Sequence, residues 1–183
     1  TRTLIRLLPD GSLDTSFAIT VGTGTIRAVE HHEGKLLVGG NFTTLNSDSN
    51  LAGIARLNLD GAVDPSFKPP KVRTSSGQGV QVVHVDSGGD VLLAGFMDAR
   101  ESSISARGFL RLASDGSIAR QGNLLAKPSV LREISPRFAE SMPRGRTVFG
   151  GDSTEVNYQS HGGVFELDPA GELTPRFVWA TNY

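Results

Sequence analysis

Residues 5–17 read IRLLPDGSLDTSF, and this stretch decides the fold because it returns along the chain. Three further copies follow it: IARLNLDGAVDPSF at 54–67, FLRLASDGSI at 109–118 and VFELDPAGEL at 164–173. Starting from Gly11, the glycine of the central turn recurs at intervals of 50, 55 and 55 residues. Periods of this size are typical of solenoids, propellers and other arrays of repeats.

A second landmark keeps nearly the same period. It reads LLVGG at 36–40, VLLAG at 91–95 and TVFGG at 147–151. A short, continuous apolar run between turn residues predicts a strand that is buried on both faces. Each repeat is then expected to supply about four short strands, which in the first repeat begin near Ile26, Leu36, Ile54 and Val63.

The turn inside the repeated stretch predicts a β-hairpin. Pro9-Asp10-Gly11 lies between two apolar runs, and a three-residue hairpin loop of this kind needs a glycine in the left-handed region. The same turns are expected at 60–61 and 115–116. This loop pairs Leu7 with Leu13 on one face of the hairpin.

On the other face the register places opposite charges across from each other. Arg6 faces Asp14 and Arg56 faces Asp64, and we expect these four residues to form structural pairs that perform no chemistry. Removing Arg56 is expected to change the free energy of unfolding by less than about 1 kcal/mol. In the third copy Arg111 faces Ala119 and is expected to lack a partner, and in the fourth Glu166 faces Thr174.

The sequence therefore predicts an all-β fold, a β-propeller-like array of about three four-stranded blades plus one extra hairpin. A single repeat domain covers residues 1–183, divided into a hairpin at 4–17, repeat one at 25–67, repeat two at 80–122 and repeat three at 130–177. The residues expected in its core are Leu7, Leu37, Val38, Leu57, Leu92, Leu93, Leu112, Val148 and Phe149.

Repeat three departs from the pattern. If residues 130–134 form its first strand, the next eleven or so residues make a surface excursion before the strand that ends at Gly151. Extra residues in one repeat lie on the surface and are free of the packing that shapes the others. The excursion offers a mix of side chains suited to protein contacts, and we expect any partner-binding surface to use Arg137, Phe138, Met142 and Arg144.

Composition bounds the class of partner. The chain has 183 residues with 18 basic and 19 acidic side chains, a net charge of −1 that favours neither nucleic acid nor an anionic membrane. It has no cysteine, so disulfides and thiolate chemistry are excluded. No apolar run approaches the roughly 18 residues of a membrane helix. The chain begins at Thr1 without a methionine, and we read it as an excised or processed piece.

No residue pattern indicates a catalytic, metal or cofactor site. Asp10, Ser12 and Asp14 alternate as at the start of a calcium loop, but the later bidentate carboxylate is missing. The four histidines, at 31, 32, 84 and 161, lack zinc-ligand spacing. The nearest candidates for paired catalytic carboxylates follow the glycine landmarks: Asp48, Asp98, Glu101 and Asp152.

The pattern Arg-Leu-Asn-x-Asp-Gly-x-x-Asp-x-x-Phe at 56–67, with the apolar strand and Gly-Gly-Asn-Phe at 35–42, resembles the delta-60 repeat. This is a repeat of bacterial secreted proteins thought to build β-propellers. The resemblance implies an extracellular or cell-surface location and offers no catalytic residues to carry over.

Three functions remain open. The first is a non-catalytic repeat module for binding or display, with other repeats, other chains, a protein or a glycan as partner. The second is a structural unit that self-assembles into a ring or filament. The third is a hydrolase or lyase that acts on polysaccharide and would need clustered carboxylates on aligned loops.

The two ends of the array carry the same kind of hairpin, so neither completes the other, and a propeller usually needs about four to eight blades. We therefore expect the piece to belong to a larger ring or assembly. Contacts with neighbouring repeats should bury apolar residues at both ends: Ile5, Leu7 and Phe17 at one, and Phe165, Leu167 and Phe177 at the other.

Overall fold

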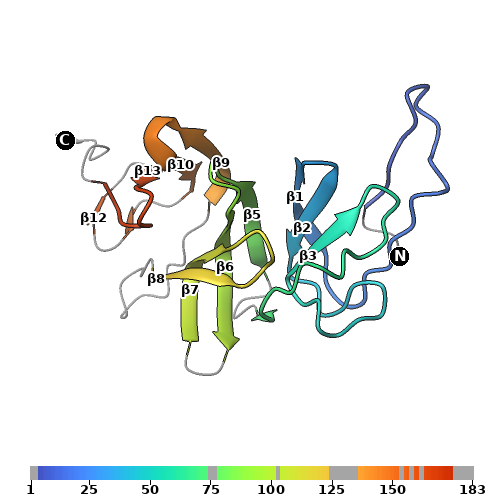
Figure 1. Cartoon of the computed structure of the whole chain (residues 1–183), viewed down its shortest axis with the longest axis horizontal. Coiled ribbons are helices and arrows are strands. Elements are labelled where there is room, and N and C mark those ends of the chain that lie inside the picture. The colour runs from blue at the N-terminus through green and yellow to red at the C-terminus, as the bar shows by residue number, and fades with distance from the viewer. Residues whose placement is uncertain are drawn as a thin grey trace.

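The apolar runs of the sequence form strands in the computed structural model, which describes residues 4–73, 78–101, 104–123, 136–152, 155–156, 159–160 and 163–174 (Figure 1). The strands are β1 (Ile26–His32), β2 (Lys35–Gly40), β3 (Ile54–Asn58), β4 (Val72–Arg73), β5 (Gly79–Val85), β6 (Val91–Glu101), β7 (Ile104–Leu112), β8 (Ile118–Asn123), β9 (Pro136–Met142), β10 (Arg146–Gly151), β11 (Glu155–Val156), β12 (Gln159–Ser160) and β13 (Val164–Leu167). The described residues contain one helical element, the short 3-10 helix η1 (Pro143–Gly145). The fold is all-β, as the sequence predicts.

Each repeat forms its own antiparallel sheet. The orders are β1–β2–β3 in repeat one, β5–β6–β7–β8 in repeat two and β9–β10–β13 in repeat three. β4 pairs with the far end of β6, and β11 pairs with β12. Repeat two is thus the four-stranded blade that the sequence predicts. In repeats one and three the fourth strand is reduced to single bridges, Leu57–Val63 and Leu167–Leu173.

The three predicted hairpin turns are confirmed. Gly11, Gly61 and Gly116 have φ of 84°, 89° and 88°, which is the left-handed region that the loop requires. Leu7 bridges Leu13, as the predicted register demands. The predicted register is wrong at one place, because a bulge follows Arg111 and shifts its partner from Ala119 to Arg120.

The sheets of repeats one and two each contribute one face to each of two hydrophobic cores, and the described residues of repeat three contribute to one. In β2, Leu37 packs into the core shared with repeat two, and its neighbour Val38 packs into the core on the side of residues 17–21. In β6, Leu93 and Leu92 divide in the same way between repeats one and three. This two-sided burial explains the continuous apolar runs. Of the predicted core, these members are buried: Leu37, Val38, Leu57, Leu92, Leu93, Leu112 and Phe149.

Repeat three is built differently from the prediction. Residues 130–134, the expected first strand, lie outside the described residues. The expected excursion is instead the first strand itself, because β9 pairs with β10 from Met142–Arg146 to Pro136–Gly151. The turn between them is η1, where Arg144 has φ 69°. Repeat three therefore has a first hairpin close in length to that of repeat one, without a surface excursion in residues 136–146.

The hairpin of residues 4–17, here called the first hairpin, stands away from the sheets at the N-terminal end (Figure 1). Leu7 was expected in the core but is 56% exposed, because the described residues place no strand beside it. Phe17 is buried within the chain, and so are Phe165 and Leu167. The expectation that these three need a neighbouring chain for burial is wrong, whereas Phe177 lies outside the described residues.

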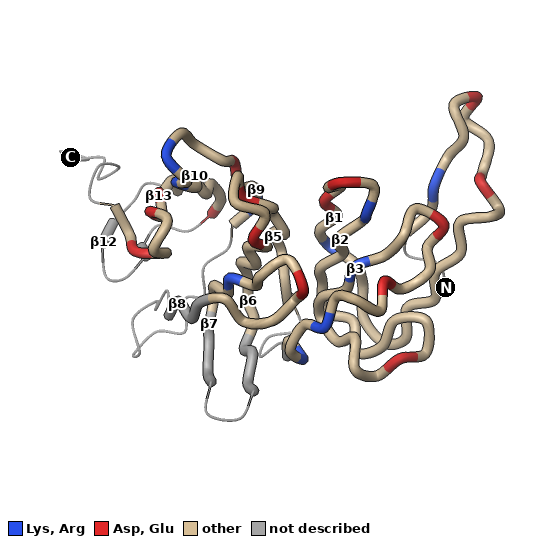
Figure 2. The backbone as a smooth tube through the Cα atoms, in the orientation of Figure 1, with Lys and Arg blue, Asp and Glu red and all other residues tan. Residues whose placement is uncertain are grey.

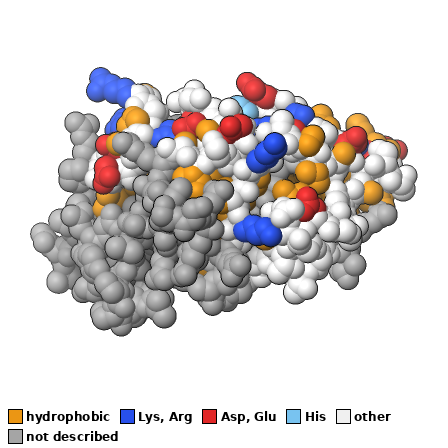
Figure 3. Space-filling model, turned by 60° about the horizontal axis from the view of Figure 1, so that its bottom comes forward, with side chains coloured by type: hydrophobic (Ala, Val, Ile, Leu, Met, Phe, Trp, Pro, Cys, Tyr) orange, Lys and Arg blue, Asp and Glu red, His pale blue; other side chains and the backbone are white. Residues whose placement is uncertain are grey.

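Acidic and basic side chains are interspersed along the backbone (Figure 2). On the face shown in Figure 3 they are mixed with apolar side chains in the described part of the surface. None of the helices in the described residues has the length and apolar character needed to cross a membrane.

Candidate functional site

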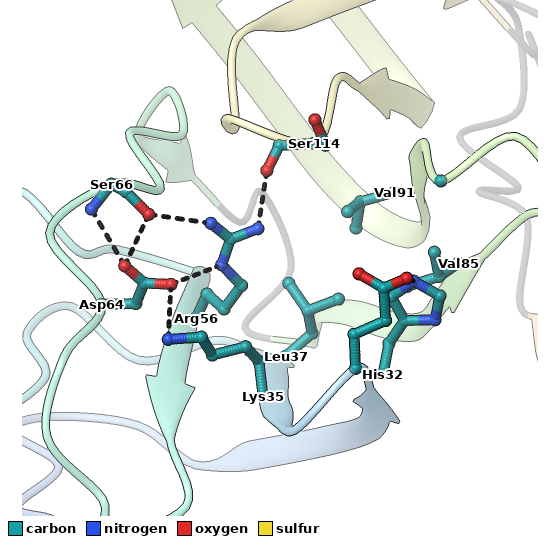
Figure 4. A pocket seen from close by; sticks show the side chains of 11 residues that line it. His32, Lys35, Leu37, Arg56, Asp64, Ser66, Val85, Val91 and Ser114 are labelled. Atoms are coloured by element: carbon teal, nitrogen blue, oxygen red, sulfur yellow. Dashed lines mark hydrogen bonds and ion pairs between the residues drawn. The ribbon is translucent and has the colours of Figure 1, made fainter.

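Two hollows in the described residues hold charged side chains. The first, here called the cleft, lies between repeats one and two and has a volume of about 290 Å³ (Figure 4). Its charged centre consists of Arg56, Asp64 and Lys35, and its apolar wall includes Leu37, Val85 and Val91. His32 and Glu33 lie at its edge, on the turn between β1 and β2.

The charges of the cleft bind each other. Arg56 Nε donates to Asp64 Oδ2 at 2.9 Å, and Lys35 Nζ lies 3.3 Å from the same oxygen. The backbone N–H and the hydroxyl of Ser66 donate to Asp64 Oδ1 at 3.0 and 2.7 Å. These donors, the Ser66 hydroxyl first, hold the pKa of Asp64 well below its ordinary value even though burial opposes the shift. The cleft is therefore a satisfied ion-pair network.

The contacts of Asp64 with arginine and serine recur at Asp14 of the first hairpin, so the two predicted structural pairs are both present. Arg6 Nε donates to Asp14 Oδ2 at 2.8 Å, and Ser16 supplies the two bonds to Asp14 Oδ1. The Ser16 hydroxyl and then Arg6 lower the pKa of Asp14 to about 2. Each arginine also lies over the phenylalanine that ends its hairpin, Phe17 at 5.1 Å and Phe67 at 4.7 Å from the ring centre.

Repeat two rebuilds this network with other residues. Arg111 was expected to lack a partner, but it donates to Asp90 Oδ2 at 2.9 Å and also binds Asp86. Asp90 stands just before β6, at the position that Lys35 holds in β2. The acid thus moves from the hairpin to the turn that precedes the neighbouring strand. The sequence-based expectation failed because it considered only residues within the hairpin.

Repeat three inverts the charges. Glu166 replaces the arginine and its side chain is 1% exposed, while Arg146, at the Lys35 position, donates to both carboxylate oxygens at 3.1 and 3.0 Å. Thr174 donates to Glu166 Oε1 at 2.9 Å. The charge on the second strand of each repeat therefore complements the charges of the hairpin beside it.

A second use of the hairpin arginine links neighbouring repeats. Arg56 Nη1 donates to the carbonyl of Ser114 at 2.6 Å, and Arg111 Nη1 donates to the carbonyl of Pro169 at 2.5 Å. Arg6 binds the carbonyl of Leu59 in the same way. Each acceptor is the first residue of the next hairpin turn along the chain, so each of these arginines binds the following repeat.

The second hollow, here called the bulge pocket, lies where the first strands of the three repeats meet. It has a volume of about 240 Å³ and is lined by Arg27, Gln81, Pro136 and Arg137. β1 packs against β5, and β5 packs against β9, which brings these residues together. Only Arg137 was singled out by the sequence.

The three polar residues occupy one structural position. Pairing shifts by one residue between Ile26 and Ala28 in β1, between Val80 and Val82 in β5, and at the Gly150–Gly151 step opposite β9. The extra residue in each case is Arg27, Gln81 or Arg137. Bulges re-aim side chains and are frequent beside binding sites. The sequence signals the bulge in β1 by a break in the alternation of apolar and polar residues, because the apolar residues Ile26 and Val29 lie three positions apart.

The guanidinium groups of the bulge pocket differ in what they bind. Arg137 donates to Asp152 Oδ2 at 3.0 and 2.5 Å, and both side chains are largely exposed. Gln81 donates to Gln78 at 2.7 Å. Among the described residues Arg27 has neither a hydrogen-bond acceptor nor an ion-pair partner. The bulge pocket thus offers one uncommitted cation, whereas the cations of the cleft are committed.

The other predicted site residues spread along β9 and its turn. The ring of Phe138 lies over Gly150, where a Cβ would be 2.2 Å from it. Phe138 is 53% exposed. Met142 ends β9 and Arg144 is exposed in η1, at the opposite end of the strand from Arg137. The four therefore do not converge on one point.

Residues considered for metal or catalytic chemistry have local roles. Asp10 accepts two bonds from Ser12. His84 Nε2 lies 2.8 Å from the Ser141 hydroxyl, across the boundary between repeats two and three. Asp48 accepts from the Asn50 backbone at 2.8 Å. Of the remaining candidate residues, Asp98 and Glu101 belong to β6, and His161 lies outside the described residues.

Comparison with known families supports a repeat of the β-propeller type. Residues 1–17 and 34–67 match the model of a family described as "Domain of unknown function (DUF5122) beta-propeller". The match covers the first hairpin and then β2, β3 and the hairpin of repeat one, the two places where an arginine pairs with an aspartate of its own hairpin. No curated protein matches the chain.

Proposed function

We propose that the chain is a non-catalytic β-propeller-type repeat module of a secreted or cell-surface bacterial protein, and that it binds an anionic group of a glycan or protein in the bulge pocket. The observation that carries this proposal is the convergence of Arg27, Gln81 and Arg137 at one bulged position of three repeats. The delta-60 resemblance supports the location, and it brings no catalytic residues.

The charge state of the pocket favours an anion. Arg27 is exposed and has no partner among the described residues, and Arg137 has one exposed carboxylate, which a bound anion can displace at little cost. A guanidinium binds a carboxylate or sulfate through two parallel N–H bonds. Gln81 adds an amide beside the two guanidinium groups.

Titration calorimetry with an oligogalacturonate and with the neutral galactose oligomer of equal length tests the proposal. We expect the acidic oligomer alone to bind, and Arg27→Gln to weaken it about tenfold, since a charge-assisted hydrogen bond contributes about 1.5–3 kcal/mol. Arg144→Gln is the matched control, because it removes an exposed arginine outside the bulge pocket. Equal affinity of the wild type and Arg27→Gln would refute binding in the bulge pocket. Release of new reducing ends from the oligomer would refute a non-catalytic role.

A structural role in an assembly of repeats is the second candidate, and a separate observation favours it. The first hairpin exposes Ile5, Leu7 and Leu13, which are 55%, 56% and 44% accessible. Apolar surface of this kind, gathered on one element, marks an interaction site. Light scattering of the 183-residue chain over a concentration series tests association directly. A chain that stays monomeric at every concentration and retains an ordered first hairpin would count against self-assembly.

A further inference from the structure

The apolar face of the first hairpin is the part of a repeat that is covered elsewhere in this chain. Ile5 and Leu7 correspond to Ala55 and Leu57 of repeat one, which are fully buried. In repeat one these side chains pack in the core formed with residues 17–21 and 42–51, and β2 pairs beside them in the sheet, Val38 with Ala55 and Leu36 with Leu57. In repeats two and three the same two positions are again buried, on strands that pair with β6 and β10.

The exposed edge of the first hairpin has the hydrogen-bonding groups of a strand that lacks a neighbour. Leu8 and Arg6 use their backbone groups within the hairpin, where Leu8 donates to Ser12 and Arg6 accepts from Asp14. Successive backbone groups of a strand point to opposite sides. Those of Ile5 and Leu7 therefore point to the other edge, and they form no backbone hydrogen bond with the described residues. An edge of this kind is a template for strand addition.

A second surface shows the same missing cover. Val83 of β5 is 6% exposed because β2 packs on it, and a Cβ added to Gly39 would lie 2.6 Å from Val83 Cγ2. The corresponding residue of β1 is Val29, which is 46% exposed. The uncovered residues thus lie on β1 as well as on the first hairpin, which is where a strand pair placed before repeat one would touch the chain.

We propose that the first hairpin and β1 accept a strand pair of the Ile26–Gly40 type, supplied by a further copy of the repeat. Its second strand adds antiparallel to residues 4–8. The pairings of β2 transfer directly, so an apolar residue at the Val38 position faces Ile5 and one at the Leu36 position faces Leu7. A glycine at the Gly39 position lets this strand approach β1.

The charges of the first hairpin select among such strands. Its Arg6, Asp14 and Ser16 reproduce the arrangement of Arg56, Asp64 and Ser66, and the missing member is the cation that Lys35 supplies. A lysine or arginine at the start of the incoming strand completes the network. In repeat two the acidic residue Asp90 stands at this position, beside a hairpin that has no acid of its own to pair with Arg111. In the first hairpin an acidic residue at this position would lie beside the Asp14 carboxylate and be repelled. The partner is therefore a strand with a basic first residue, two apolar residues spaced by one, and a terminal Gly-Gly.

This inference rests on the assembly candidate and is independent of anion binding at the bulge pocket. The probe is a synthetic peptide with the sequence of residues 25–41, added to the full 183-residue chain, whose own repeats already hold their strands. We expect saturable binding, and slower hydrogen exchange at the amides of Ile5 and Leu7 with little change in the cleft. Because the opposing charge is lost and a like charge is placed beside Asp14, Lys35→Asp in the peptide should weaken binding at least tenfold, whereas Lys35→Arg should preserve it.

Two controls separate the possible failures. A peptide with Leu36→Asn and Val38→Asn keeps the charge but loses the apolar contacts, and it should not bind. Leu7→Asp in the protein should abolish binding of the wild-type peptide without unfolding the chain, since Leu7 is exposed. Absence of exchange protection at residues 4–8 under saturating peptide, or equal binding of the Lys35→Asp peptide, would overturn the strand-acceptor proposal. Self-association by light scattering without peptide binding would leave an assembly role standing and remove only this acceptor.

Discussion

The first hairpin and the hairpin of repeat one share the contacts among arginine, aspartate and serine but differ in exposure. Arg6 and Asp14 bind each other as Arg56 and Asp64 do, with the same serine bonds and the same phenylalanine beneath the arginine. Yet Leu7 is 56% exposed, whereas Leu57 is fully buried. The contacts among arginine, aspartate and serine thus need only the hairpin, whereas burial of the apolar face needs a core packed against it.

The largest expected difference between the two hairpins lies in their leucines. Leu57→Ala should lower the free energy of unfolding by about 2–5 kcal/mol, because it leaves a cavity in the core between repeat one and residues 17–21. Leu7→Ala should change it by about 0.5 kcal/mol or less. Urea denaturation at a concentration where the chain is monomeric measures both. A large loss for Leu7→Ala would mean that the first hairpin is covered in solution.

The arginines should differ less. The side chains of Arg56 and Asp64 are 18% and 6% exposed, so the earlier expectation of less than about 1 kcal/mol for an exposed pair does not apply. Arg56→Ala leaves a buried carboxylate short of a donor and should cost about 1–3 kcal/mol. Arg6 is 37% exposed, and Arg6→Ala should cost less than about 1 kcal/mol. Denaturation of both variants at one ionic strength checks the order, which would be contradicted by equal losses.

The turn glycines sharpen the same contrast. Gly11→Ala and Gly61→Ala both force an alanine into the left-handed region, at about 1–2 kcal/mol. A Cβ at Gly11 meets open space, whereas at Gly61 it would lie 3.0 Å from the Ala18 carbonyl. We therefore expect Gly61→Ala to lower the melting temperature more than Gly11→Ala does. Equal shifts would show that the segment after the first hairpin yields to the added methyl.

The smallest expected effect is a fall in the free energy of unfolding at low pH. The folded chain lowers the pKa of Asp14 to about 2 and lowers that of Asp64 as well, from about 3.9 in an unfolded chain. The stability that each carboxylate contributes is fully present above pH 4 and is lost as pH falls toward the folded value. Asp14→Asn and Asp64→Asn should each flatten part of the decline in unfolding free energy between pH 4 and 2.5. A decline as steep as that of the wild type in both variants would assign it to other carboxylates.

Features that depend on neighbouring residues in the sequence could be predicted, and features that depend on distant ones could not. The turns at Gly11, Gly61 and Gly116 follow from local turn chemistry. The partners of Arg111 come from the turn between β5 and β6, more than twenty residues earlier, and the charge that they carry is opposite to that of Lys35, so no fixed spacing marks them.

The first strand of repeat three was misplaced for a related reason. Residues 130–134 are richer in β-branched and apolar residues than β9, which begins with a proline and carries three polar or charged side chains. β9 is a strand because β10 pairs with it, which is a tertiary effect. The bulge pocket was missed because each bulge moves a residue such as Arg27 to a face that simple alternation does not assign to it.

The forward reach of the hairpin arginines gives the array a direction and a nearest-neighbour cooperativity. Loss of structure in one hairpin turn removes an acceptor from the arginine of the repeat before it, so disorder at a turn propagates toward the N-terminal side. The series of bonds between repeats ends at Glu166, because its side chain has no N–H to donate. Its carboxylate pairs with Arg146 of the same repeat. A repeat grafted after Glu166 would therefore join without a guanidinium bond across the junction. Removing a repeat from between Arg6 and Glu166 would break one guanidinium bond at each junction where an arginine binds the following repeat.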